Sequence, residues 1–148
     1  MGANSQRVRG DDSFTAVTRK ILSARQRAGW AVNREMLSLF WQLGRDLRAL
    51  DATERRQGRS VEQLAAHLHA AFPESICFSR ANLQRMCAFA KAWPDFVAVE
   101  PLLTQLTWDH HLVLLSKLKT RKQRLAYAQR ALEHGWSSET LAAHIGPR

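Results

Sequence analysis

Glycine, proline and cysteine are all scarce in this chain of 148 residues, which has 7 glycines, 4 prolines and 2 cysteines. No stretch alternates Val, Ile and Thr for more than a few residues, so the turns and strands of a β fold are not indicated. Cys77 and Cys87 are too few for a disulfide scaffold. The sequence therefore predicts an all-α fold in a reducing, cytoplasmic setting.

Long apolar runs are also missing. No run reaches the length of about 18 residues that a membrane-spanning helix requires, so we expect no membrane partner. Residues 1–12 lack the apolar stretch of a secretion signal. We expect them to form a disordered N-terminus, followed by one helical domain over residues 13–146.

Acidic residues are outnumbered by basic ones. The chain has 22 Lys and Arg against 13 Asp and Glu, which gives a formal net charge of +9. A surplus of this size favours a polyanionic partner, and nucleic acid is the simplest one.

A long first helix is predicted over residues 14–50, with Ser13 as its cap. Its apolar residues recur about every 3.67 positions, a period typical of a straight or slightly right-handed helix. Such a helix would be about 55 Å long, and a globule of this size is only about 40 Å across. We therefore expect either a bend, at Gly29 or Gly44, or packing of part of the helix on another chain. The apolar positions are Val17, Ile21, Ala24, Ala28, Val32, Met36, Leu39, Leu43, Leu47 and Leu50.

Shorter helices are expected after a polar connection over residues 51–59. Serine or threonine caps mark their starts, and Pro73, Gly135 and Gly146 mark ends. The caps are Ser60, Ser79, Thr107, Thr120 and Ser137.

The pair of helices over 60–72 and 79–92 resembles a helix-turn-helix. Arg and Gln side chains make bidentate contacts to guanine and adenine edges, which suits them to a reading helix. No acid occurs between Glu74 and Asp95. An ordinary helical hairpin remains the alternative, because residues 72–78 are longer than the usual turn of three or four residues. The groove candidates are Arg80, Gln84, Arg85 and Lys91.

A second basic segment spans residues 117–130. No acid occurs between Asp109 and Glu133, which fits a surface that contacts phosphates. A solvated helix face is the alternative interpretation. The phosphate candidates are Lys117, Lys119, Arg121, Lys122, Arg124 and Arg130.

Metal and catalytic motifs are not found. His110 and His111 are adjacent and point about 100° apart on a helix, so we expect one ring to be packed and the other exposed. The cysteines form no CxxC pair, and no P-loop, nucleophile elbow or dinucleotide fingerprint occurs. We therefore expect a binding module without metal or cofactor.

Four segments resemble the N-terminal domain of the bacterial YhcG family. They are ARQRAGWAVNREMLSLFWQLGRDL (24–47), FSRANLQRMCAFAKAWP (78–94), LTWDHHLVLLSKLK (106–119) and YAQRALEHGWSSETLAAHI (127–145). The positions that match the family motifs include Asn33, Trp41, Ser79, Asn82, Trp108, His110, His111, Gly135 and Trp136.

The resemblance implies a helical domain that recognises DNA or mediates assembly, placed before a nuclease domain of the PDDEXK fold. Family members often have basic residues at the positions of Ala81 and Cys87. Because this chain stops at Arg148, before the metal-binding residues of such a nuclease, we expect it to have no nuclease activity.

Two functions are therefore predicted. The leading one is a non-catalytic DNA-binding or DNA-targeting domain of a YhcG-type nuclease system. The alternative is a protein-interaction module that dimerises, or docks on a nuclease subunit, through the long first helix.

Overall fold

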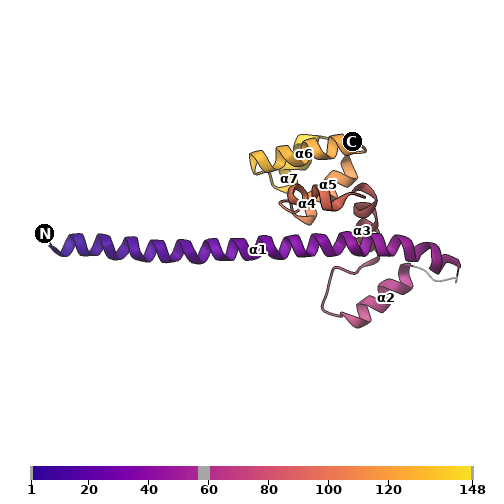
Figure 1. The fold of residues 1–148 in the computed structure, drawn as a ribbon, viewed down its shortest axis with the longest axis horizontal. Coiled ribbons are helices and arrows are strands. Elements are labelled where there is room, and N and C mark those ends of the chain that lie inside the picture. The colour runs from indigo at the N-terminus through magenta and orange to yellow at the C-terminus, as the bar shows by residue number, and fades with distance from the viewer. Residues whose placement is uncertain (1, 57–60, 148) are drawn as a thin grey trace.

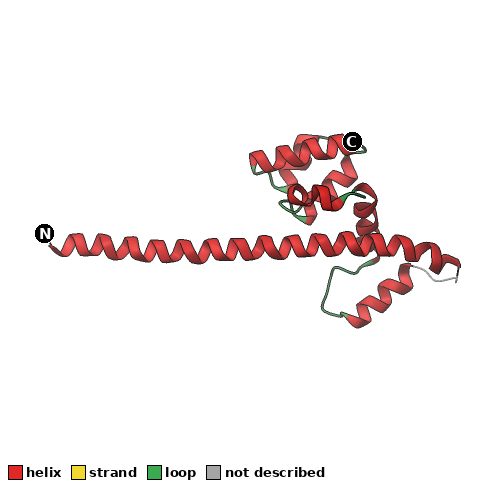
Figure 2. Ribbon diagram, viewed as in Figure 1, coloured by secondary structure: helices red, strands yellow, loops and turns green. Residues whose placement is uncertain are grey.

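A computed structural model describes the backbone of residues 2–56 and 61–147, and the side chains of residues 13–50 and 62–147. These residues form helices and connecting loops without strands, which confirms the all-α prediction (Figure 2). The helices are α1 (Gly2–Arg56), α2 (Val61–Ala71), α3 (Arg80–Ala92), α4 (Phe96–Leu103), α5 (Trp108–Lys117), α6 (Arg121–His134) and α7 (Ser138–Ile145).

The first helix dominates the shape of the molecule. With 55 residues, α1 is about 80 Å long. It runs almost straight, and its N-terminal half extends well beyond the other helices (Figure 1). The helices α3 to α7 lie against its C-terminal half, and α2 lies on the other side of it (Figure 1). The bend considered at Gly29 or Gly44 is therefore not present.

The bounds of α1 differ from the predicted ones at both ends. Because the helix begins at Gly2, Ser13 lies inside it and does not cap it, and no break in the helix separates residues 2–12 from the rest. Residues 51–56 continue α1, although a connection was expected to start at residue 51. The predicted cap Ser60 lies outside the described residues.

The other predicted caps are confirmed. The hydroxyl groups of Ser79, Thr107, Thr120 and Ser137 each accept a hydrogen bond from the backbone three residues further on. Gly135 ends α6 with a φ of 63°, in the left-handed region where glycine is preferred. Local sequence signals therefore placed these helix ends correctly.

Helix α4 has no counterpart among the predicted helices. Asp95 precedes it without a side-chain capping bond, and Pro101 lies inside it. Its buried residues Phe96 and Leu103 instead pack with Phe89 and Trp93 of the α3 segment. Tertiary burial therefore stabilises this short helix where local signals are weak.

The helices α1 and α3 approach each other closely where they cross at Gly44. A β-carbon at this position would overlap the carbonyl oxygen of Met86 and lie 3.0 Å from the β-carbon of Ala90. Phe40, four residues earlier on α1, is buried beside Met86 and Leu83. Glycine at position 44 thus lets the two helix backbones touch and closes the core around them.

Replacing Gly44 with alanine should therefore destabilise the fold. We expect Gly44→Ala to lower the free energy of unfolding by about 2 kcal/mol, because α1 and α3 must separate to admit the methyl group. Urea denaturation followed by circular dichroism measures this change. The matched control is Gly29→Ala, since a β-carbon at Gly29 has nothing within 4 Å. This control should raise stability by up to about 1 kcal/mol. Equal effects of the two substitutions would contradict the close approach.

Candidate nucleic-acid interface

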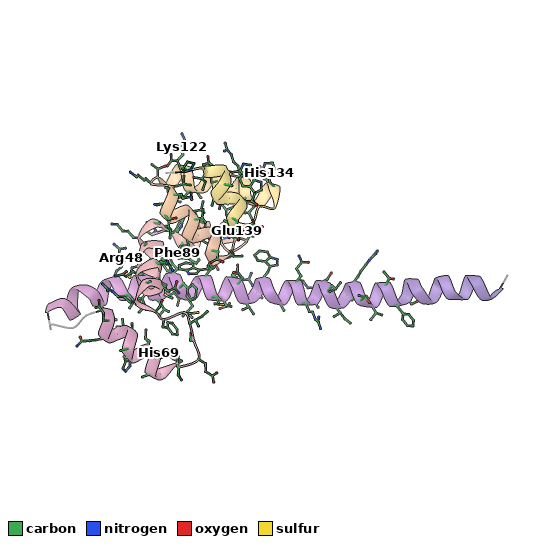
Figure 3. The ribbon with its side chains drawn as sticks, turned by 180° about the vertical axis from the view of Figure 1, so that it is seen from behind. Arg48, His69, Phe89, Lys122, His134 and Glu139 are labelled. Atoms are coloured by element: carbon green, nitrogen blue, oxygen red, sulfur yellow. The ribbon has the colours of Figure 1, made fainter. Side chains whose placement is uncertain are left out.

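Helix α3 has one buried face and one exposed face. Leu83, Met86 and Ala90 are buried, together with Phe89, which lies between the bundle and α1 (Figure 3). Gln84, Arg85 and Lys91 are exposed, and the neighbouring Ala81 and Ala88 add no bulk to that side. The outward side of this helix is therefore basic and shallow.

Arg80 has a structural partner. Its Nε atom lies 2.9 Å from Oε1 of Glu62 on α2, and both side chains are more than half exposed. The pair ties the start of α3 to α2. The other three groove candidates, Gln84, Arg85 and Lys91, lie exposed on the outward side of α3.

The connection between α2 and α3 covers residues 72–79. It is longer than a helix-turn-helix turn, as the sequence indicated. Two of its side chains, Cys77 and Phe78, pack against the buried cluster of Phe40, Leu83 and Met86. The connection is therefore part of the core surface and fixes how α2 sits beside α3.

The basic segment 117–130 is divided between structural and exposed residues. The Nζ atom of Lys117 donates a hydrogen bond to the carbonyl of Gly146 at 3.1 Å. The Nη2 atom of Arg124 donates to the carbonyl of Leu118 at 2.9 Å, and burial lowers the pKa of this guanidinium. Both side chains thus stabilise the fold through hydrogen bonds to the backbone. Neither is well placed to contact a phosphate.

Apart from Arg121, which pairs with Asp95, the remaining cations of this segment are exposed. They are Lys119, Lys122 and Arg130, and the guanidinium of Arg130 lies over the ring of Tyr127 at 5.1 Å. Lys122 lies on the outer side of the bundle, away from α1 (Figure 3). These three side chains are the members of the segment that a phosphate backbone can reach.

Arg121 and Asp95 join the two basic segments. Both terminal nitrogens of the Arg121 guanidinium donate to the Asp95 carboxylate, at 2.6 Å each, and the guanidinium also lies 5.3 Å from the Trp93 ring. The hydrogen bond from Arg121 lowers the pKa of Asp95. Because Asp95 follows α3 and Arg121 begins α6, the pair places Lys91 and Lys122 at neighbouring helix ends.

Sequence reasoning treated Asp95 only as the end of an acid-free stretch. It did not identify Asp95 as the partner of Arg121. The sequence places three acidic residues, Asp95, Glu100 and Asp109, between the two basic segments, and their spacing does not indicate which of them pairs with Arg121. The pair neutralises the Asp95 carboxylate, so the surface between the two segments stays basic.

Two side chains that match the family motifs, Asn33 and Trp41, hold the bundle on α1. Nδ2 of Asn33 on α1 donates to the carbonyls of Thr104 (3.0 Å) and Leu106 (2.8 Å), between α4 and α5. The indole of Trp41 donates to the carbonyl of Trp93 at 2.7 Å. These bonds fix the bundle on α1 and leave the two side chains no obvious ligand role.

Asn82 links three segments of the chain. Its Nδ2 donates to the carbonyl of Cys77 at 2.7 Å, and its Oδ1 accepts from the indole of Trp108 at 2.9 Å. Trp108 in turn packs edge-on against Phe40 and Phe89. This motif residue therefore connects the α2–α3 loop, α3 and α5.

Both histidines of the adjacent pair are buried, which corrects the expectation that one would be exposed. Nε2 of His110 donates to the carbonyl of Trp136, and its Nδ1 lies 2.7 Å from the hydroxyl of Thr107. Nε2 of His111 donates to the carbonyl of Leu103 at 2.8 Å. Each ring thus finds an acceptor on a different neighbouring segment, so both can pack inward.

No group of three or more His, Cys, Asp or Glu side chains within the described residues is arranged to hold a metal ion. Among those residues, no helix is long and apolar enough to cross a membrane. The described fold and surface define an all-α domain with an extended first helix and a basic side formed by α3 and α6.

Comparison with known proteins identifies the family of the chain. The chain belongs to the DUF1016 N-terminal domain family, whose profile matches residues 16–148. This assignment is consistent with the YhcG-like resemblance of the four motif segments. No curated protein and no solved structure matches the chain.

The burial of His111 predicts a dependence of stability on pH. Burial lowers the pKa of His111 from 6.5 to about 4. In the unfolded state the His111 ring therefore becomes protonated below about pH 6.5. In the folded state it stays neutral until the pH falls to about 4. Stability should fall as the pH drops from 6.5 to 4, by up to about 3 kcal/mol from this residue.

His111→Gln is the matched variant, because glutamine can donate a hydrogen bond but does not titrate in this range. Urea denaturation of both proteins at pH 7 and pH 4.5 measures the difference. The variant should lose less stability than the wild type over this interval. The same loss in both proteins would show that His111 is not the titrating group.

Proposed function

We propose that this chain is a DNA-binding domain that uses the outward side of α3 and the exposed cations beside α6. The observation that carries the proposal is the Arg121–Asp95 ion pair, which brings the ends of α3 and α6 together. The pair supports a single basic surface in place of two separate ones. Such a surface can neutralise several phosphates at once.

Within this surface the side chains have different roles. Gln84 and Arg85 are the candidates for base edges, because both can form two hydrogen bonds to one base. Lys91, Lys119 and Lys122 are the candidates for phosphates, which they contact as point charges. Arg80, Lys117, Arg121 and Arg124, all named as sequence candidates, act through the fold that positions these groups.

We further propose that the domain is not itself catalytic and that it serves a YhcG-type nuclease. The resemblance of the motif segments supports this link, since they precede a nuclease domain in the family. DNA binding by this domain would then bring the nuclease to its substrate.

A second function is favoured by a different observation. Much of the N-terminal half of α1 carries exposed apolar side chains, including Phe14, Val17 and Ile21. Surface of this kind is typical of an interaction site. We therefore also propose that α1 mediates assembly, by dimerisation or by docking on a nuclease subunit.

Charge reversal tests the DNA surface. The pairs Arg85→Glu with Lys91→Glu, and Lys119→Glu with Lys122→Glu, should each weaken binding to a random duplex by about tenfold or more. Each pair should also reduce the slope of log affinity against log salt by about 2. Fluorescence anisotropy over a salt series measures both quantities.

The matched control is Arg19→Glu with Arg27→Glu. It makes the same change in net charge at exposed positions of α1, far along the helix from α3. The control should bind more tightly than either test variant. If all three variants bind alike, net charge alone explains the affinity and the proposed surface is wrong.

A further inference from the structure

One side of α1 carries an apolar stripe that the bundle does not cover. Val17, Ile21, Val32 and Leu39 are each between 45% and 57% exposed, although all are strongly apolar. Their spacings of 4, 11 and 7 residues are close to whole numbers of helical turns, so all four lie on one side of the helix. We define the apolar stripe as Val17, Ile21, Ala24, Ala28, Val32, Met36, Leu39 and Leu43.

The stripe is distinct from the side of α1 that holds the bundle. The bundle contacts are made by Asn33, Leu37, Phe40 and Gly44, which are buried or half-buried. At 100° per residue, these positions lie about a third of a turn from the stripe. Only Leu43 serves both sides, because it also packs beside Phe40. The bundle thus covers one face of α1, and the apolar stripe on another face stays exposed.

The spacing of the stripe reads the same in both directions about residue 30. An antiparallel copy centred there would place Val17 opposite Leu43 and Ile21 opposite Leu39. The two alanines would meet larger residues, with Ala24 opposite Met36 and Ala28 opposite Val32. The stripe therefore pairs small side chains with larger ones near its centre, and branched apolar side chains with each other towards its ends.

Two oppositely charged residues towards the edges of the stripe have the same symmetry. Arg25 and Glu35 are both exposed and lie five positions on either side of residue 30. In an antiparallel pair, Arg25 of each copy faces Glu35 of the other. In a parallel, in-register pair, arginine would face arginine and glutamate would face glutamate. Flanking charges of this kind set the orientation of paired helices.

We propose that the apolar stripe binds a second copy of this chain, with the two α1 helices antiparallel and centred on residue 30. The period of about 3.67 residues keeps the stripe parallel to the axis of a straight helix, so the contact spans residues 17–43, about 40 Å. This inference deepens the assembly function proposed above. It is independent of DNA binding.

Charge reversals at the two flanking residues test the proposal. In an antiparallel pair, Arg25→Glu alone places glutamate opposite Glu35 twice, and Glu35→Arg alone places arginine opposite Arg25 twice. Each single variant should raise the dimer dissociation constant by about tenfold. The double variant, Arg25→Glu with Glu35→Arg, restores both attractive pairs. It should return to within about threefold of the wild type.

Arg19→Glu is the matched control, since Arg19 is exposed and lies on the opposite side of α1 from the stripe. It changes the net charge as Arg25→Glu does and should leave the dissociation constant unchanged. Sedimentation equilibrium over a range from micromolar to several hundred micromolar measures all five proteins. Circular dichroism confirms that each variant keeps its helices.

The outcomes separate this inference from the assembly function as a whole. A wild type that stays monomeric throughout this range overturns self-pairing and leaves docking on another subunit as the form of assembly. A dimer that does not respond to the single reversals overturns the antiparallel register, although self-association stands. Weakening by both singles with recovery in the double variant supports the proposal.

Discussion

The contact between the backbones of α1 and α3 at Gly44 is the constraint on which the rest of the structure depends. It allows Met86 to be fully buried against α1 and encloses Phe40 and Leu83 beside it. Asn33 and Trp41 then donate to backbone carbonyls of the bundle from earlier turns of the same helix. One face of α1 is therefore fixed by a tight crossing and by hydrogen bonds next to it.

The residues that match the family motifs differ from the residues that we propose to bind DNA. The polar motif residues form their hydrogen bonds inside the domain, as Asn82 does with Cys77 and Trp108. Buried polar groups need such partners, so these residues define the fold. Among the described residues, the exposed cations Arg85 and Lys91 of α3 and Lys122 of α6 make no comparable internal bond. The motifs thus identify the family, and the proposed DNA surface rests on different residues.

Much of the fold could be predicted from the sequence because its signals are local. Ser79, Thr107 and Gly135 mark helix ends through bonds and backbone angles within a few residues of themselves. The errors concern partners that are distant along the chain. His110 can be buried because the carbonyl of Trp136 accepts a hydrogen bond from its Nε2 atom. Periodicity on one helix cannot reveal that acceptor.

Prediction of the candidate site from the sequence was limited in the same way, because contacts between residues distant along the chain could not be foreseen. A run of basic residues indicates excess positive charge, but it does not show which members are used by the fold. Lys117 and Arg124 donate to backbone carbonyls, and Arg121 pairs with Asp95 across the bundle. Tertiary contacts therefore decide which of the basic residues remain candidates for DNA binding.

The unequal faces of α1 connect the two proposed functions. Pairing about residue 30 would place the two crossings at Gly44 on opposite sides of the centre, about 40 Å apart along the helix axis. Each crossing holds one α3 and its basic side, so the dimer would present two such surfaces at a fixed separation. Two linked sites bind a long duplex more tightly than one, because the second contact is made within an existing complex. A straight α1 would then serve as the spacer that sets the distance between them.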